Sequence, residues 1–237
     1  MKGEFPDVVN RDGSFRFTEY AYAVRTSHPG VPRTIQGARA TPDAAEWEAV
    51  ANREMMSLGE RKVYKLARRK AVPPGRKRIK SKWVMKRKAD NSYKARLVAQ
   101  GWNQVHGLDC GSTFAPVCRL QSVRIFVAIT VEYDLDMDHM DVSTAFLYAV
   151  IQEKVFVEQA PGFEVKDGGE LVMQLEKSLY GLAQSPGNWF HTIDPVLVDI
   201  GFVPLKSDTC VYVYKDVKIT LRLYVDDLRL AGNKSAS

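Results

Sequence analysis

The sequence predicts an α+β protein in which helices pack on an antiparallel sheet, and three observations lead to this prediction. Residues 41–60 and 120–133 carry apolar side chains at the spacing of an α-helix. The end of the chain instead alternates apolar and polar side chains between turns, which is typical of a β-meander. Helices and strands do not alternate as regular β-α-β units, which favours an antiparallel sheet over a parallel one.

The basic residues are concentrated in one segment. The chain has 237 residues, 45% hydrophobic and 26% charged, as expected of a folded protein with a sizeable core. Its net charge is +6, and from Arg61 to Lys88 14 of the 28 residues are Lys or Arg and none is acidic. Such a surface attracts phosphate groups, so nucleic acid is the leading expected partner, the alternative being a solvated or targeting surface. The candidate contacts are Arg76, Lys77, Arg78 and Lys80.

The sequence shows no signal for secretion or for a membrane span. No apolar run approaches the roughly 20 residues that cross a bilayer, and the first residues contain no apolar signal region. We therefore expect an intracellular protein, cytoplasmic or nuclear, without membrane contact. Cys110, Cys118 and Cys210 lack the paired spacing of a zinc site and are expected to be buried, reduced thiols.

The first half of the chain is expected to contain one helix and a basic hairpin. Residues 1–41 mix Gly, Pro, Ser, Thr and charge without periodicity, which predicts a mostly disordered lead-in. Thr41 is the expected N-cap of the next helix, with Pro42 at its first position and Trp47 on its apolar face. Residues 80–87 and 94–100 read as two strands joined by the turn "KADNS".

The second half is expected to alternate helices with strands of one sheet. Residues 120–133 predict a buried helix, "LDMDHMDV" a strand that ends near Asp141, and "DVSTAFLYAV" a short helix. A helix over residues 185–200 should be kinked or stopped by Pro195. "CVYVYKD", "VKITLRLYV" and "LRLAG" then form the meander, with Leu221 and Leu223 on one face.

Two adjacent carboxylates, Asp226 and Asp227, lie at the last turn of that meander. Taken alone, such a pair is most often a solvated turn. Asp141, at the end of another predicted strand, adds a third carboxylate, and three converging carboxylates are stable mainly when they bind cations. Hard oxygen ligands favour Mg²⁺, and two such ions can activate an attacking hydroxyl and stabilise a leaving pyrophosphate. The pattern therefore indicates nucleotidyl transfer.

Several motifs together resemble one family. "YVDD" and "DVSTAFL" resemble the polymerase core of reverse transcriptases, and "KARLVAQGWNQVHGLD", "TFAPVCRLQSVR", "VEQAPGF" and "LEKSLYGLAQSPGNW" resemble the copia-type class of LTR retrotransposons. The resemblance runs from about Trp47 to Gly232. It implies an RNA-directed DNA polymerase with two Mg²⁺ ions, a primer–template and dNTPs as partners, and leaves the oligomeric state open. It also implies a right-hand fold, with fingers over residues 42–119 and, over residues 120–237, a palm whose antiparallel sheet is backed by helices.

The resemblance also implies roles for individual residues. Asp141 and Asp226 would bridge the metals, with Asp227 auxiliary and the Val142 carbonyl completing a metal shell. Phe146 would exclude a 2′-hydroxyl, although core packing is the alternative. Tyr180 and Gly181 would line the ribose and base, and Lys94 and Arg96 would face the triphosphate, where the alternatives are an ordinary turn and ordinary strand charges.

Departures from the family pattern predict weak or absent synthesis. The chain ends five residues after Gly232, so the resemblance leads us to expect that the family's thumb is not part of this sequence. Arg229, Tyr148, Ala149, Gly187 and Pro195 depart from the residues usual at these positions. Three hypotheses therefore stand: a polymerase core, a catalytically dead nucleic-acid-binding remnant, and a translation product that does not fold stably.

Overall fold

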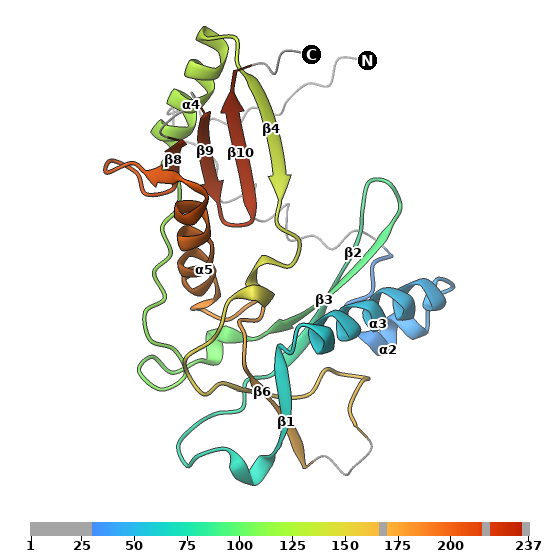
Figure 1. Ribbon diagram of the computed structural model, residues 1–237. Helices are drawn as coiled ribbons and strands as arrows, with labels where there is room; N and C mark the ends of the chain where they lie inside the picture. The colour runs from blue at the N-terminus through green and yellow to red at the C-terminus, as the bar shows by residue number, and fades with distance from the viewer. Residues whose placement is uncertain (1–29, 166–169, 215–218, 234–237) are drawn as a thin grey trace, which may run out of the picture.

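A computed structural model describes residues 30–165, 170–214 and 219–233. These residues combine helices with antiparallel sheets, as the sequence predicts. Figure 1 shows one end of the molecule built from a five-stranded sheet with helices α4 and α5, and the other from two smaller sheets with helices α2 and α3. Most of the predicted lead-in, residues 1–29, lies outside the described residues.

The five-stranded sheet contains the predicted meander. Its strands, in spatial order, are β4 (Asp136–Asp141), β10 (Asp227–Gly232), β9 (Ile219–Tyr224), β8 (Val211–Tyr214) and β7 (Phe202–Pro204). Helices α4 (Leu120–Glu132) and α5 (Ser185–Ile200) pack against it. Leu221 and Leu223 share a buried cluster with Leu197 of α5, so the predicted apolar face of the meander is confirmed.

The smaller sheets surround a separate core. One is the basic hairpin of β2 (Ser81–Arg87) and β3 (Tyr93–Ala99), close to the predicted strand bounds. The other joins β1 (Tyr64–Arg68), β6 (Leu171–Leu175) and β5 (Phe156–Val157), and the sequence did not predict it. Helices α2 (Ile35–Arg39) and α3 (Ala44–Glu60) cover this core. The described residues also form short 3₁₀ turns η1 (Arg69–Ala71), η2 (Gly101–Asn103) and η3 (Ala145–Tyr148), and η3 is the predicted short helix after Asp141.

The beginning of α3 differs from the prediction. The helix starts at Ala44 and its N-cap is Asp43, because the Thr41 hydroxyl donates to the Ala38 carbonyl at 2.7 Å instead of accepting from the helix. The preceding helix α2 lies inside the segment predicted to be mostly disordered, and Ile35 and Ala38 on it are fully buried. Their burial against the core explains why this polar segment is ordered.

Two further predictions concern helices α5 and α4. Helix α5 runs through Pro195 to Ile200, so of the two predicted outcomes, a kink or a stop, the stop does not occur. Helix α4 has the predicted position, but it is not a buried helix: Phe126 and Thr130 are its buried residues, while Ile125, Val127 and Val131 are exposed. Its outer face is uncovered within the described residues, which periodicity alone could not reveal. Along those residues no helix has both the length and the apolar character that a bilayer span requires.

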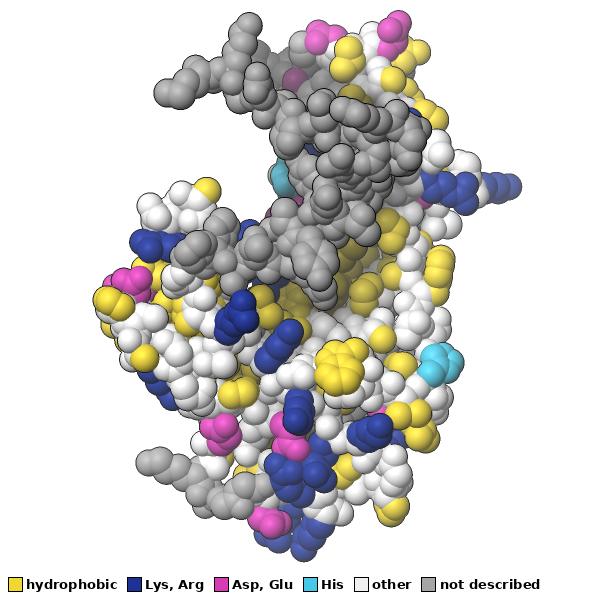
Figure 2. All heavy atoms as spheres, turned by 180° about the vertical axis from the view of Figure 1, so that it is seen from behind, with side chains coloured by type: hydrophobic (Ala, Val, Ile, Leu, Met, Phe, Trp, Pro, Cys, Tyr) yellow, Lys and Arg dark blue, Asp and Glu magenta, His cyan; other side chains and the backbone are white. Residues whose placement is uncertain are grey.

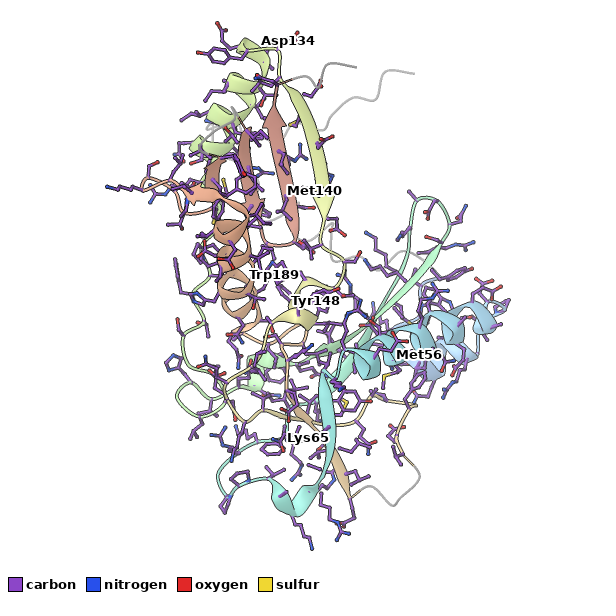
Figure 3. All side chains as sticks on the ribbon, viewed as in Figure 1. Met56, Lys65, Asp134, Met140, Tyr148 and Trp189 are labelled. Carbon is purple, nitrogen blue, oxygen red and sulfur yellow. The ribbon has the colours of Figure 1, made fainter. Side chains whose placement is uncertain are left out.

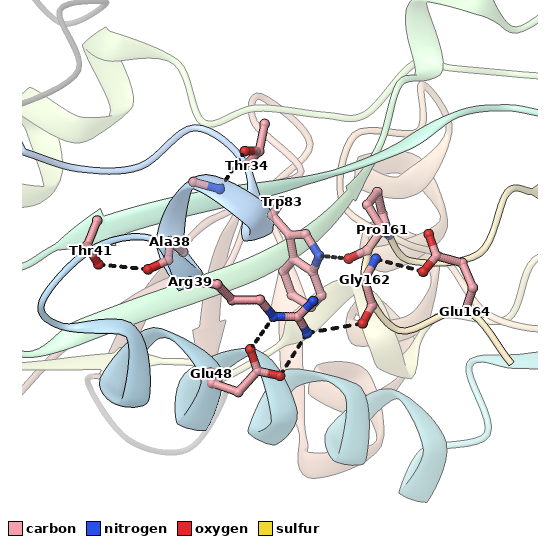
Figure 4. Close-up of polar contacts among 10 residues, drawn as sticks. Thr34, Ala38, Arg39, Thr41, Glu48, Trp83, Pro161, Gly162 and Glu164 are labelled. Atoms are coloured by element: carbon pink, nitrogen blue, oxygen red, sulfur yellow. Dashed lines mark hydrogen bonds and ion pairs between the residues drawn. The ribbon is translucent and has the colours of Figure 1, made fainter. Parts of the chain in front are cut away.

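Arg39 fastens helix α2 to its surroundings (Figure 4). Its guanidinium donates two hydrogen bonds to the Glu48 carboxylate on α3, at 2.9 and 3.0 Å, and one to the Gly162 carbonyl at 3.2 Å. Nearby, the indole N–H of Trp83 donates to the Pro161 carbonyl at 2.9 Å. These contacts hold the loop after β5 against the hairpin.

The three cysteines are free and buried, as predicted. Burial raises the pKa of the Cys210 thiol to about 12, and it raises that of the Cys118 thiol beside it. Both groups are therefore neutral thiols at physiological pH, which suits the apolar cluster that they form with Val211.

One acidic side chain is buried under the basic hairpin. Glu54 of α3 is 9% exposed, and its carboxylate accepts a hydrogen bond from the Leu97 N–H of β3 at 3.2 Å. Burial raises the pKa of Glu54 above 4.5, although the Leu97 N–H and the charges of Arg96, Lys94 and Arg61 oppose the shift. The folded state therefore binds this proton more tightly than the unfolded chain does.

Replacing Glu54 tests whether its negative charge stabilises or destabilises the folded state. A raised folded pKa means that stability is largest below pH 4.5 and decreases as pH rises through the folded pKa. Glu54→Gln keeps the acceptor and removes the charge, so we expect it to raise Tm at pH 7 by about 2–4 °C, the shift for roughly 1 kcal/mol, and to have a smaller effect near pH 4.5. Glu48→Gln on the same helix is the control: its pKa is lowered by Arg39, so this variant should lower Tm at pH 7. A lower Tm for Glu54→Gln at pH 7 would contradict the assignment.

Candidate active site

The register of two strands brings the predicted carboxylates to one place. Asp141, the last residue of β4, is the Cα partner of Asp227, the first residue of β10. Directly opposed residues of an antiparallel pair lie on the same face of the sheet. Asp226 precedes them in the turn, and its carbonyl accepts a hydrogen bond from the Val142 N–H at 2.9 Å. The structure thus places Asp141, Asp226 and Asp227 together at one end of β4 and β10.

The turn that carries Asp226 has a strained backbone. Tyr224 and Asp227 are paired, so Val225 and Asp226 form a two-residue hairpin loop. Val225 has φ +57°, whereas Asp226 is not among the residues with positive φ, which is the pattern of a type II′ turn. A β-branched residue rarely adopts positive φ. Such strain persists only where the surroundings determine the conformation, and here Trp189 of α5 donates its indole N–H to the Val225 carbonyl at 2.7 Å.

The carboxylates are neighbours without forming a ready-made ligand cluster. Among the residues that the structure describes, no group of three or more His, Cys, Asp and Glu side chains is placed to hold a metal ion. The Asp227 carboxylate instead contacts His139 Nε2 at 3.1 Å, and both side chains are about half exposed. The Val142 carbonyl accepts from the Ala145 N–H at 3.2 Å within the turn that leads into η3. The donor set is nevertheless all oxygen and accessible, as a hard divalent cation requires.

Three predicted nucleotide contacts, Phe146, Tyr180 and Arg96, lie against one another. The ring centroid of Phe146 lies 4.9 Å from that of Tyr180, and Arg96 Cζ lies 4.4 Å from the Tyr180 centroid. The Tyr180 hydroxyl is buried and has no hydrogen-bond partner in the described part of the chain. Burial raises its pKa, Arg96 opposes that shift, and Asp226 and Asp141 add to it. Tyr180 therefore lies within electrostatic range of the two carboxylates.

Lys94 faces the same region from β3. It is two residues from Arg96, so both side chains share a face of the strand. Burial and the Arg96 and Lys88 charges lower the pKa of Lys94, while Asp141 raises it. The positive charge of Lys94 on the hairpin thus lies close enough to Asp141 of the five-stranded sheet to interact with it.

Gly181 is required by the close approach of two backbones. Its φ is +88°, and a Cβ at this position would overlap the Ala99 carbonyl oxygen. The Ala99 N–H donates to the Tyr180 carbonyl at 2.8 Å, and the Gly101 N–H donates to the Gly181 carbonyl at 3.2 Å. These bonds join the Tyr180 loop to the end of β3.

The four basic candidates divide into two pairs. Arg76 donates to the Leu108 and Lys154 carbonyls at 2.6 and 2.8 Å, and Arg78 donates to the Glu158 carboxylate at 3.0 Å. Lys77 and Lys80 are exposed. Figure 2 shows Lys and Arg side chains gathered over the half of the rear face that the smaller sheets form. The side chains that remain accessible for phosphate are therefore chiefly the two lysines.

Sequence reasoning missed two residues beside the carboxylates, Trp189 and His139. Trp189 stands in the motif "SPGNW", but its partner is a backbone carbonyl 36 residues further along the chain. No local pattern signals such a contact. His139 lies on β4 between Asp138 and Met140, and only the strand register shows that it reaches Asp227.

Comparison with known proteins gives consistent matches. Residues 61–237 match the reverse transcriptase (RNA-dependent DNA polymerase) family. The chain is 34% identical over 239 residues to the retrovirus-related Pol polyprotein from transposon TNT 1-94 of Nicotiana tabacum, covering 98% of the chain and 17% of that relative. It is 37% identical to the Pol polyprotein from transposon RE2 of Arabidopsis thaliana, over 68% of the chain and 12% of the relative. It is 33% identical to the Ty1-H Gag-Pol polyprotein of Saccharomyces cerevisiae, over 68% and 9%. The chain thus spans a small part of the length of these relatives.

A substitution at Gly181 tests the close approach. Gly181→Ala and Gly75→Ala both place a side chain on a left-handed residue, at a backbone cost of about 1–2 kcal/mol. Gly75 has φ +82° and nothing within 4 Å of an added Cβ, so it is the matched control. We expect Gly181→Ala to lower the free energy of unfolding by clearly more than Gly75→Ala, because only Gly181 meets the Ala99 carbonyl. Equal losses in denaturant titration would show that the two backbones are not in contact.

Proposed function

We propose that this chain, which belongs to the reverse transcriptase family of copia-type retrotransposons, holds the core that copies RNA into DNA. The observation that carries the proposal is the strand register that sets Asp141 opposite Asp227, with Asp226 in the adjoining turn. This arrangement has a direct chemical use, because carboxylates so placed can hold the cations that nucleotidyl transfer needs.

The residues present fit divalent metal ions by their chemistry. Reverse transcriptases generally use such ions, and we propose two Mg²⁺ held by Asp141 and Asp226, with Asp227 and the Val142 carbonyl as further ligands. The ions would supply charge stabilisation for the transferring phosphoryl group. The His139 contact must open for Asp227 to join the ligand set, and the half-exposed position of both side chains allows that movement.

The tilted ring pair of Phe146 and Tyr180 is proposed as the floor of the nucleotide pocket. Phe146 would lie beneath the sugar and exclude a 2′-hydroxyl by collision, since its ring is held against Tyr180 and cannot retreat freely. Tyr180 and Gly181 would line the ribose and base. Lys94, whose pKa is influenced by both Arg96 and Asp141, would orient the triphosphate together with Arg96 and offset its charge.

The domain division is also a proposal. Residues 42–119 would form the fingers and residues 120–237 the palm, with residues 1–41 as lead-in. The five-stranded sheet lies wholly in the second part and the basic hairpin wholly in the first. The β1-β6-β5 sheet joins strands from both parts, so the two would move as one body there.

A second candidate function is nucleic-acid binding without catalysis. The observation that favours it is the lack, in the described ranges, of three side chains already placed around a cation. The exposed lysines of the basic segment do not depend on that cluster, so binding would persist where catalysis is lost. The two candidates therefore differ in one measurable property, metal-dependent primer extension.

Asp226→Asn separates the two candidates. We expect the parent chain to extend a primer on an RNA template with Mg²⁺ only weakly, and Asp226→Asn to reduce that extension by about a hundredfold or more, because several kcal/mol of charge stabilisation are lost. Asp138→Asn on β4 is the control, since this exposed carboxylate pairs with Leu230 away from the turn. Both variants should bind primer–template as the parent does. Binding by the parent without any extension would support the second candidate.

The salt dependence of binding tests the basic surface. Exposed lysines that contact phosphates contribute about one unit each to the slope of log K against log salt. We expect Lys77→Gln with Lys80→Gln to flatten this slope by up to about two units. Arg76→Gln should chiefly lower Tm, because that guanidinium is bonded to two carbonyls. A slope unchanged in the lysine variant would exclude this surface as the binding site.

A further inference from the structure

Trp189 connects three segments of the candidate active site. It lies on α5, is 4% exposed, and packs in one cluster with Ala145 and Ala149. Val142 and Phe146 pack against the same cluster. Figure 3 shows Trp189 beside the segment that carries Tyr148. A single side chain thus contacts the chain between Asp141 and the proposed nucleotide pocket.

The polar end of the same side chain holds the carboxylate turn. The indole N–H donates to the Val225 carbonyl at 2.7 Å. The next carbonyl, that of Asp226, accepts from the Val142 N–H at 2.9 Å. Both carbonyls of the two-residue loop are therefore occupied, one from α5 and one from the end of β4. This pair of bonds accounts for the persistence of φ +57° at Val225.

We propose that Trp189 is a positioning residue for the Asp226–Asp227 turn, and that its ring and its indole N–H together set the distance between the carboxylates and the Phe146 pocket. This inference rests on the proposed function of the site. Trp189 touches neither substrate nor cation: it acts through Val225 on one side and through Ala145 and Phe146 on the other.

The physical reason is the cost of leaving the strained turn unsupported. Without the indole donor, the Val225 carbonyl loses its bond and the residue is free to return to negative φ, which Val strongly prefers. That change rotates the following peptide and carries the Asp226 and Asp227 side chains with it. The carboxylates would then hold a cation less tightly, even though neither has been replaced.

The test compares two tryptophans that make the same kind of bond. Trp83 is also 4% exposed and donates its indole N–H to a backbone carbonyl, that of Pro161, at 2.9 Å. Trp189→Phe and Trp83→Phe both keep an aromatic ring and remove the donor, so we expect similar losses in Tm. Only Trp189→Phe should accelerate amide exchange at residues 225–228 and weaken binding of Mn²⁺, used alone as the probe, by about tenfold, which is 1.4 kcal/mol. Affinity for primer–template should be unchanged in both variants.

A second pair of variants covers the case in which Trp189→Phe folds poorly. Glycine adopts positive φ without strain, so Val225→Gly removes the need for the anchor. We expect Val225→Gly to raise Tm by more in the Trp189→Phe background than in the parent. Trp189→Phe should also weaken Mn²⁺ binding less in that background.

The outcomes distinguish this inference from the proposed function. Equal exchange rates and equal Mn²⁺ affinities in Trp189→Phe and Trp83→Phe, or additive effects of Val225→Gly, would overturn the positioning role. A parent chain whose Mn²⁺ binding is unaffected by Asp226→Asn would overturn the proposed metal site. Amide exchange at the turn would still decide the role of Trp189 in that case, because it does not depend on the cation.

Discussion

The pairing of β4 with β10 in one register is the constraint on which the candidate site depends. Because side chains alternate between the two faces of a strand, a slip by one residue would turn Asp141 away from Asp227 and His139 away from Arg229. The register is fixed from both directions. Leu228 is buried in the cluster beneath the sheet, and the Val142 N–H closes on the Asp226 carbonyl just beyond the last pair. The burial of Leu228 thereby helps to determine that Asp141 lies opposite Asp227.

Charge is arranged so that the basic hairpin can lie near the acidic strand ends. Lys94 and Arg96 repel each other along β3, and Glu54 beneath them and Asp141 across from them offset that repulsion. The buried carboxylate of Glu54 would be costly without its bond from Leu97 and these neighbours. Lys94 and Arg96, which are proposed to orient the triphosphate, thus also lie close to the buried carboxylate of α3.

Much of the secondary structure could be predicted from the sequence, and the reasons for the failures are physical. The strand bounds of the basic hairpin and of the meander follow from period-two patterns that are local. The β1-β6-β5 sheet was missed because β1 lies within a run of basic residues and β5 has two residues, so neither shows a clear pattern. Asp141, Asp226 and Asp227 could be nominated from residue type and turn position. Trp189, Glu54 and His139 could not, because their partners are chosen by packing between elements distant in the sequence.

The β1-β6 pairing also bears on how the chain acquires its fold. Tyr64 of β1 pairs with Leu175 of β6, and β5 pairs with the other edge of β6. The strand β1 therefore cannot pair until residues much later in the sequence have been synthesised. Closing so long a loop costs conformational entropy before the strands form stabilising contacts. Topologies rich in contacts between residues distant in the sequence therefore fold slowly. At a synthesis rate of about 5–20 residues per second, β1 would emerge from the ribosome seconds before its partner. Until β6 is synthesised, the unpaired β1 is therefore expected to be kept from aggregating by chaperones or by the net positive charge of its own segment.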